Sequence, residues 1–392
     1  LKNMKKKIAI LGSTGSIGKC IFDIVKKDKK NFEILFLAAN TNYKELLKQA
    51  KIFNVKNLLI ADKKTFKKVL NKYKKKTKIN FHNNYDSLDK IFKGKKIDYT
   101  MSAISGLYGL DPTLKIIKYT KNIAIANKEA IICGWNLIYK NLKMNSTTFI
   151  PIDSEHFSIW SLLDIKKNNN IERIFITASG GPFYNFPLKK FKSITPKLAL
   201  KHPNWKMGQK ISIDSSTMMN KVFEIMEAKK IFDLQYNKLS IFLHTQSYIH
   251  AIVKFNNGLT KILIHDTNMT IPIFNSLYPD NEKNIESKKL NLNIINNLKL
   301  KTIDQKRFPV IKILKNLPNK NSLFETVIVS ANDRLVNLFL KKKINYLDIS
   351  KFLLIIIKDK EFKKYKTIKP KNIDEIKKLS DYVSLKIDLL SI

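Results

Sequence analysis

Short apolar runs alternate with amphipathic segments over the first 150 residues of the chain. An apolar run of strand length predicts a β-strand, and apolar residues that recur three and four apart predict a helix. The predicted strands are 7–11, 33–39, 58–61, 99–104 and 123–126. The predicted helices are 17–27, 44–53, 63–73, 107–119 and 129–142. This alternation is typical of a parallel, doubly wound sheet.

The middle of the chain mixes helices with a second group of strands. A helix at 155–163, a polar loop at 166–170 and a strand at 173–178 come first. Three further strands are predicted at 239–245, 248–255 and 259–265, and Asn256-Asn257-Gly258 is a hairpin signal between the last two. These strands predict an antiparallel addition to the middle of the chain.

A short strand at 210–214 is predicted to lead into a helix that Ser215 or Ser216 caps. On that helix Asn220, Glu224 and Glu227 share one face at the spacing i, i+4, i+7. The opposite face is apolar and comprises Met219, Val222, Phe223 and Met226. The helix is therefore predicted to be amphipathic, with its polar face either solvated or contributing Glu224 to a metal site.

The last part of the chain reads as helical, with helices predicted at 323–341, 348–358 and 372–390. We expect an α/β fold class with three domains. They are an N-terminal Rossmann-like, doubly wound parallel sheet (1–150), a central α/β catalytic domain (151–278) and a C-terminal helical domain (304–392). The polar, Asn-rich segment 279–303 is predicted to be a linker before the helical domain.

The formal net charge of +41 raises the possibility of nucleic-acid binding. Nearly all the basic residues are lysines, however, and arginine occurs only at Arg173, Arg307 and Arg334. Direct base readout favours the forked guanidinium of arginine. The lysines are spread along the chain among many Asn, Ile, Phe and Tyr residues, a mix typical of A/T-rich codons. We therefore expect no nucleic-acid partner, although a basic surface attracts phosphorylated substrates.

Cysteine use and hydropathy bear on the compartment. Cys20 and Cys133 lie far apart and match neither a disulfide framework nor a metal spacing. No apolar run approaches the roughly 20 residues that span a bilayer. The first residues run straight into a strand and leave no room for a signal peptide. These features predict a cytoplasmic protein with no membrane partner.

The first predicted strand leads into a glycine-rich turn, Gly12-Ser13-Thr14-Gly15-Ser16-Ile17-Gly18, and then a helix. Strand, glycine turn and helix together hold a dinucleotide pyrophosphate at a helix N-terminus. A plain strand-to-helix turn is the alternative. The next strand ends at Asn40-Thr41-Asn42, without the acid that binds a ribose 2′-hydroxyl, so the sequence favours NADPH over NADH.

The segment Ile150–His156 ends an apolar run in two carboxylates and a histidine. In extended chain, residues two apart point to the same side, so Asp153 and Glu155 can converge. Two carboxylates so placed suit Mg²⁺ or Mn²⁺. The alternative is an ordinary helix cap at Asp153 or Ser154.

Three further segments carry candidate chemistry, each with a structural alternative. Lys128 and Glu129 follow a strand end, where open α/β sheets bind ligands, but such a pair can also be solvated. Ser179-Gly180-Gly181 can offer a hydroxyl and amides to an anion, or form a simple turn. The segment 202–208 carries Trp205 and Met207 in a polar loop, which indicates a lid or a loop anchored on the core. His244 and His250 are expected to be structural.

Taken in order, these segments resemble the 1-deoxy-D-xylulose 5-phosphate reductoisomerase family over nearly the whole chain. The motifs are G-S-T-G-S-I-G at 12–18, A-N-K-E at 126–129, P-I-D-S-E-H at 151–156, S-G-G-P-F at 179–183, H-P-N-W-K-M-G at 202–208 and D-S-S-T-M-M-N-K at 214–221, with Glu224. Val222 and Phe223 stand where the family has Gly-Leu. Six motifs in the family's order make the resemblance specific.

The resemblance implies a role for each matched position. Metal ligands would be Asp153, Glu155 and Glu224. Substrate contacts would be Lys128, Ser154, Glu155, Ser179, His202, Ser215, Asn220, Lys221 and Glu224. NADPH contacts would be Thr14, Gly15, Ser16, Ile17, Asn42, Asn127, Glu129 and Gly208. Catalytic residues would be Lys128, Asp153, Glu155, His202, Trp205 and Glu224, with Trp205 and Met207 in a flap over the substrate.

The resemblance further implies conversion of 1-deoxy-D-xylulose 5-phosphate to 2-C-methyl-D-erythritol 4-phosphate, a step of isoprenoid precursor biosynthesis. NADPH and a divalent metal (Mn²⁺, Mg²⁺ or Co²⁺) would be the cofactors, the substrate a small phosphorylated sugar and the assembly a homodimer. A different NADPH-dependent oxidoreductase on the same fold is the alternative.

Overall fold

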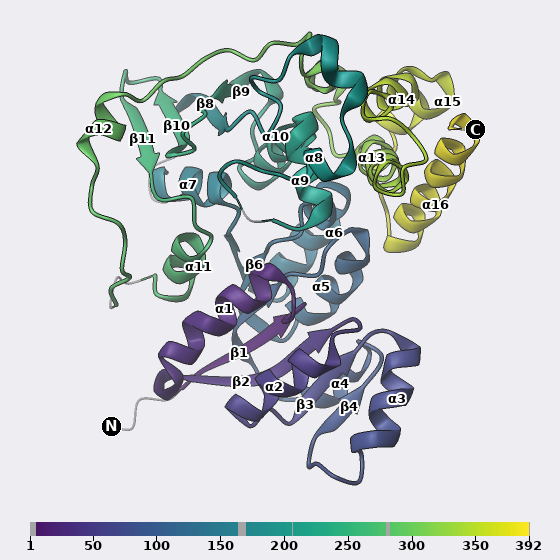
Figure 1. Ribbon diagram of the computed structural model, residues 1–392. Helices are drawn as coiled ribbons and strands as arrows, with labels where there is room; N and C mark the ends of the chain where they lie inside the picture. Colours follow the sequence, from purple (N-terminus) through teal and green to yellow (C-terminus); the bar gives the residue numbers. More distant parts are fainter. Residues whose placement is uncertain (1–4, 164–169, 206, 280–282, 392) are drawn as a thin grey trace. The chain divides into compact units, whose positions relative to one another are not determined.

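The computed structural model describes residues 5–163, 170–205, 207–279 and 283–391 (Figure 1). The chain forms two compact units. The first comprises 1–130, 136–153 and 269–285, and the second comprises 131–135, 154–268 and 286–392. The three-domain division expected from the sequence stays a prediction, and it places 269–278 in the central domain, whereas those residues pack with the first unit.

The first unit contains a sheet of seven parallel strands in the order β4-β3-β2-β1-β5-β6-β7. The strands are β1 (Lys6–Leu11), β2 (Phe32–Ala39), β3 (Asn57–Ile60), β4 (Asn80–His82), β5 (Ile97–Ser102), β6 (Thr120–Ile125) and β7 (Thr148–Pro151). The strand order reverses between β1 and β5, and open parallel sheets bind ligands at such a switch point. The expected doubly wound sheet is confirmed.

Helices connect the strands of this sheet. They are α1 (Ser16–Lys27), α2 (Tyr43–Phe53), α3 (Lys63–Tyr73), α4 (Ser87–Ile91), α5 (Leu110–Ile117) and α6 (Lys128–Met144), with short 3-10 turns η1 (Lys29–Asn31) and η2 (Leu107–Gly109). A helix that the sequence analysis did not predict, α11 (Thr270–Leu277), places Ile273 and Leu277 in the core of this unit. Tyr99 of β5 and Ser276 of α11 share a buried hydrogen bond of 2.7 Å between their hydroxyl groups.

The second unit is built on a four-stranded sheet in the order β11-β10-β8-β9. Its strands are β8 (Ile171–Ala178), β9 (Leu239–Leu243), β10 (Ile249–Phe255) and β11 (Thr260–Ile264). β10 pairs antiparallel with both neighbours, which confirms the hairpin, whereas β8 and β9 are parallel. The helices around it are α7 (Ser154–Leu162), α8 (Pro196–Ala199), α9 (Gln209–Thr217), α10 (Met219–Ile231) and α12 (Leu292–Asn296), with η3 (Leu188–Ser193), η4 (Tyr236–Lys238) and η5 (Pro309–Asn316).

The end of the chain is helical, as expected, and belongs to the second unit. Its elements are α13 (Phe324–Leu340), α14 (Tyr346–Lys358), α15 (Lys360–Lys363), η6 (Lys364–Lys366) and α16 (Ile373–Leu390). The predicted linker contains only α12 and a single bridge from Lys301 to Leu243 among its described residues. Of the predicted loop at 166–170, only Asn170 is among the described residues, and it has no regular structure.

The prediction of a strand at 210–214 is wrong, because these residues lie in helix α9. The alternation of Ile211 and Ile213 with polar residues favoured a strand, yet Lys210 and Asp214 form an i, i+4 ion pair of 2.9 Å along the helix. Ser215 and Ser216 therefore lie in the last turn of α9 instead of capping the next helix. Met218 has a left-handed backbone, with φ of 71°, at the junction before α10.

Solvation of the polar face of α10, one of the two predicted alternatives, is also wrong. Its polar face is buried along with its apolar face, since Glu224 is 1% exposed and Glu227 is 2% exposed. Buried carboxylates require partners, because an unpaired buried charge costs several kcal/mol. The buried carboxylates of α10 therefore indicate that this helix belongs to a binding or catalytic site.

Candidate functional site

Three carboxylates from separate elements meet in one cluster. Asp153 follows β7, Glu155 lies in the first turn of α7, and Glu224 lies in the middle of α10. One ligand atom from each lies within 4.8 Å of the others. Asp153 is bonded directly to Ser154, the first residue of the second unit in this segment, so the chain itself brings it to Glu155. Carboxylate oxygens at this spacing are the donor set of a Mg²⁺ or Mn²⁺ site.

Lysine and amide donors surround these carboxylates. Lys221 donates to Glu155 and, at 2.6 Å, to Glu224. Burial alone lowers the pKa of Lys221, but the charges of Glu155 and Glu224 outweigh burial and hold that pKa above its usual value. Asn220 donates to the other oxygen of Glu224, and Ser154 donates to the other oxygen of Glu155. Five of the predicted site residues are thus within hydrogen-bond distance of one another.

A buried histidine braces the two helices that carry Glu155 and Glu224. The His156 Nε2 atom lies 2.8 Å from the backbone carbonyl oxygen of Glu224, and its Nδ1 atom lies 3.8 Å from Glu227 Oε2. His156 comes from α7 and its partners come from α10, so the imidazole fixes the spacing of the two carboxylate-bearing helices. His156 and Glu227 were not predicted as site residues. The available signals were the place of His156 in the 151–156 motif and the position of Glu227 on the same helix face as Glu224.

Ser179 and His202 form a second group. The Ser179 hydroxyl lies 3.1 Å from His202 Nε2 and accepts the Gly181 N–H at 3.2 Å. Burial, together with the positive charge of Lys221, lowers the pKa of His202 to about 4. Gly181 has φ of +63°, and a Cβ there would lie 2.8 Å from the Ser215 carbonyl oxygen. The glycine therefore lets the Ser179 turn approach the backbone of Ser215.

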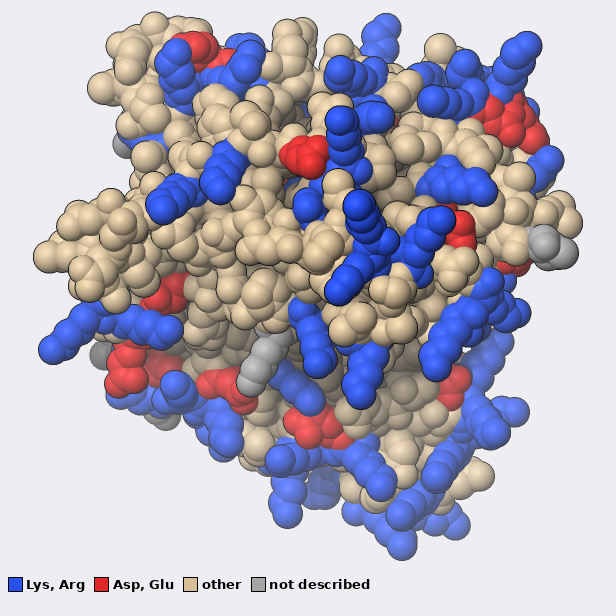
Figure 2. All heavy atoms as spheres, turned by 45° about the horizontal axis from the view of Figure 1, so that its top comes forward, with Lys and Arg blue, Asp and Glu red and all other residues tan. Residues whose placement is uncertain are grey.

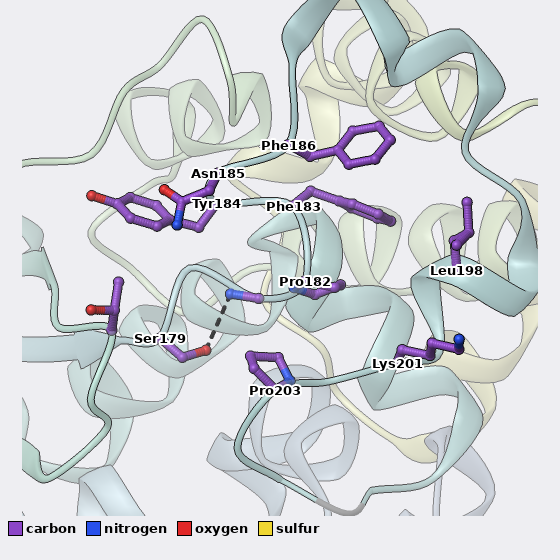
Figure 3. Close-up of a pocket in the computed structure, with 11 residues that line it drawn as sticks. Ser179, Pro182, Phe183, Tyr184, Asn185, Phe186, Leu198, Lys201 and Pro203 are labelled. Atoms are coloured by element: carbon purple, nitrogen blue, oxygen red, sulfur yellow. Dashed lines mark hydrogen bonds between the residues drawn. The ribbon is translucent and has the colours of Figure 1, made fainter.

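A pocket of about 460 Å³ opens beside Ser179 (Figure 3). Its wall includes Ser179, the apolar side chains of Pro182 and Phe183, and Lys201 and Pro203 from the segment that leads to Trp205. The pocket therefore adjoins the start of the predicted flap. Gly208 is the N-cap of α9, and its carbonyl oxygen accepts the Ser212 N–H at 3.1 Å.

The glycine turn of the first unit has the close packing of a dinucleotide site. Gly12 has φ of +78°, and a Cβ there would lie 2.5 Å from the Ala103 carbonyl oxygen. A Cβ at Gly18 would overlap the Gly12 carbonyl oxygen. Gly15 and Ser16 are exposed at the start of α1, which has no side-chain cap. The free N–H groups of this helix start are suited to a pyrophosphate.

The other predicted cofactor residues are helix caps or neighbours of caps. The Asn42 side chain accepts the Glu45 N–H, and the Asn127 side chain accepts the Ala130 N–H at 2.8 Å. Asn127 also donates to the backbone carbonyls of Ile104 and Gly106. Lys128 is ion-paired with Asp153, and Glu129 is buried. Lys128 is therefore a paired group and not a solvated charge.

Family models match three parts of the chain. A model of 1-deoxy-D-xylulose 5-phosphate reductoisomerase matches residues 8–134. Two models of C-terminal domains of the same enzyme match residues 149–232 and 265–383.

Curated relatives and solved structures carry the same name. A reductoisomerase of Pelagibacter ubique is 63% identical over 99% of this chain and 100% of its own length, and one of Clostridium perfringens is 38% identical over 89% and 91%. The structure of the Zymomonas mobilis enzyme in complex with NADPH aligns with a TM-score of 0.86 at 30% identity, covering 99% of both chains. A reductoisomerase structure with NADPH, fosmidomycin and magnesium aligns with a TM-score of 0.88 at 29% identity, covering 98% of this chain and 99% of the other.

Proposed function

Because this chain belongs to the 1-deoxy-D-xylulose 5-phosphate reductoisomerase family, we propose that the cluster of Asp153, Glu155 and Glu224 is its catalytic centre. The chain is an NADP-dependent oxidoreductase. It rearranges 1-deoxy-D-xylulose 5-phosphate and reduces the product to 2-C-methyl-D-erythritol 4-phosphate, with NADPH and a divalent metal ion as cofactors. The meeting of three carboxylates is the observation that supports the proposed centre most directly.

The three carboxylates fit a hard divalent cation. When bound there, the metal supplies a Lewis acid that polarises the ketone and neighbouring hydroxyl of the substrate. Asn220 and Ser154 orient the carboxylates through the hydrogen bonds described above, and His156 fixes the helix that carries Glu224. Mg²⁺ is the expected ion, and Mn²⁺ and Co²⁺ are proposed as substitutes.

The substrate phosphate is proposed to bind Ser179, Ser215, Asn220 and Lys221. His202 Nδ1 accepts two backbone N–H groups, so its Nε2 carries the proton and donates to Ser179. Ser179 thus has its own hydroxyl hydrogen available for an anion. Lys128 is proposed to bind the substrate beside the Asp153 carboxylate.

NADPH is proposed to bind the glycine turn, with its pyrophosphate at the N–H groups of Ser16 and Ile17 and beside Gly15, whose own N–H donates to the Gly12 carbonyl oxygen at 3.1 Å. The remaining contacts proposed from the first unit are Thr14 after β1, Asn42 after β2, and Asn127 and Glu129 after β6. Gly208, at the start of α9, is proposed as a contact from the second.

We propose a homodimer that forms through β11. This strand is at the edge of its sheet. Ile262 on the strand is 51% exposed, and Leu259 in the turn before it is 57% exposed. An exposed apolar edge strand is a template for pairing with a second copy. Size-exclusion chromatography with light scattering tests this proposal, and a monomer at micromolar concentration contradicts it.

A cytoplasmic location and the absence of a nucleic-acid partner stay predictions. Both cysteines are free, and no helix in the described ranges is long and apolar enough to cross a membrane. Lysine and arginine side chains are spread across the face shown in Figure 2, with acidic residues among them, and do not gather in one stripe. A spread charge of this kind supports general attraction of anions.

The test is NADPH oxidation, followed at 340 nm, with 1-deoxy-D-xylulose 5-phosphate before and after chelation and with metal restored. We expect oxidation that requires the metal and yields 2-C-methyl-D-erythritol 4-phosphate. A panel of other carbonyl compounds is the control. Preference for another compound would support a different NADPH-dependent oxidoreductase.

A further inference from the structure

The segment before the flap tryptophan is tied down by a side chain that has no predicted role in substrate binding. The Asn204 amide donates two hydrogen bonds, to the Thr245 carbonyl oxygen at 2.9 Å and to the Ser247 hydroxyl at 2.7 Å. Both acceptors belong to the turn between β9 and β10, and Ser247 has a left-handed backbone with φ of 55°. One side chain therefore joins the flap to the sheet of its own unit.

His202 holds the same segment from within. Its Nδ1 atom accepts the N–H groups of both Asn204 and Trp205, at 3.1 and 3.0 Å. Its Nε2 atom faces the Ser179 hydroxyl on the wall of the pocket in Figure 3. Two backbone N–H groups of the segment 202–205 therefore donate to one imidazole. Asn204 is bonded through its backbone N–H to His202 and through its side-chain amide to the turn between β9 and β10.

The Trp205 ring rests on a defined surface. Its edge meets the His250 ring, with centroids 6.3 Å apart and planes at 75°. The His250 ring stacks on His265 with centroids 3.6 Å apart, and its Nε2 atom lies 3.1 Å from the His265 carbonyl oxygen. The ends of β10 and β11 therefore form a seat of two stacked rings for the tryptophan.

We propose that Asn204 is a positioning residue that fixes the root of the flap, so that Trp205 closes on the His250 seat and retains the reaction intermediate. This inference rests on the proposed function. The rearrangement converts the substrate into an isomeric aldehyde phosphate, and NADPH then transfers hydride to its carbonyl carbon while the oxygen gains a proton. An aldehyde that escapes before this second step consumes no NADPH. A lid placed incorrectly therefore changes how the aldehyde partitions between release and reduction.

The experiment compares wild type with Asn204→Asp, which keeps the shape of the side chain but loses both donors. Free aldehyde is trapped with a hydrazine reagent, its hydrazone is separated by chromatography from the hydrazone of the substrate ketone, and its amount is divided by the amount of NADPH oxidised in the same time. We expect a rise of roughly tenfold to a hundredfold in this ratio, since a misplacement of about 1 Å costs on that scale. The melting temperature and the Kd for NADPH are expected to stay at the wild-type values, which excludes general unfolding.

Ser247→Ala is the matched variant, because it removes one acceptor and leaves the Thr245 carbonyl in place. We expect a smaller rise in the same direction. If Asn204→Asp does not fold, Ser247→Ala decides the question alone. A ratio equal to that of wild type overturns the proposal, even where kcat falls. Failure of the wild type to turn over 1-deoxy-D-xylulose 5-phosphate would instead overturn the proposed function.

Discussion

The buried ion pair between Lys230 and Glu325 offers the sharpest test of how the second unit is held together. Lys230 is in the last turn of α10, the helix of Glu224, and Glu325 is in the first turn of α13. The charged groups are 3.0 Å apart, and the two side chains are 2% and 0% exposed. Lys230 also donates to Asn321 at 2.8 Å, and Glu325 accepts both the N–H and the hydroxyl of Ser322.

Replacing Glu325 with Gln removes the negative charge and keeps the shape. The Lys230 ammonium is then left buried without a countercharge, and the new amide hydrogens face the donors of Ser322. Breaking a buried pair from one side costs about 3–5 kcal/mol. Replacing both partners with methionine removes both charges, so the free energy of unfolding is expected to return to within about 1 kcal/mol of wild type or to exceed it.

Guanidinium unfolding followed by tryptophan fluorescence reports the unfolding of the second unit, because Trp135, Trp160 and Trp205 all lie in it. Comparison of midpoints and slopes gives the free energy of unfolding for each variant. A loss below about 1 kcal/mol for the single variant, or a double variant as unstable as the single one, would show that an unpaired buried charge is not what destabilises the unit.

Three other perturbations bear on the site itself. Glu224→Gln is expected to remove turnover and weaken Mn²⁺ binding, measured by electron paramagnetic resonance, with the fold retained because Lys221 keeps Glu155 as its countercharge; full activity would contradict the metal assignment. Gly18→Ala is expected to weaken NADPH binding in a fluorescence titration, because its Cβ overlaps the Gly12 carbonyl oxygen, and an unchanged Kd would count against the turn. Because burial lowers the pKa of His202 to about 4 from its usual 6.5, the unfolded chain takes up this proton first. The contribution of His202 to stability is therefore fully present above pH 6.5 and is lost as the pH falls toward 4, and His202→Asn is expected to flatten that slope in urea unfolding.

Hydrophobic patterning predicted most of the elements but failed where tertiary contacts competed with local preference. The segment 210–214 has the alternation of a strand, yet Gly208 starts a helix there and the Lys210–Asp214 pair supports it. The sequence analysis assigned no element to Thr270–Leu277, where helix α11 forms and buries Ile273 and Leu277. In both places the burial of a short segment against distant residues decided its conformation, and periodicity records only the local preference.

The sequence by itself determined the family and the residue types of the site, because six motifs stand in the family's order along the chain. It also determined the parallel sheet, because strands and helices alternate over the first 150 residues. It also placed Asp153 and Glu155 together, because only Ser154 separates them, although Glu155 lies in the first turn of α7 and not in the extended chain that was predicted. Only the tertiary structure decided the partners that join distant segments. Lys221 meets Glu155 across 66 residues, and Asn204 meets Thr245 and Ser247 across 41 and 43. The physical reason is that a buried donor takes whichever acceptor the fold brings within hydrogen-bond distance, and no local pattern in the sequence records that choice.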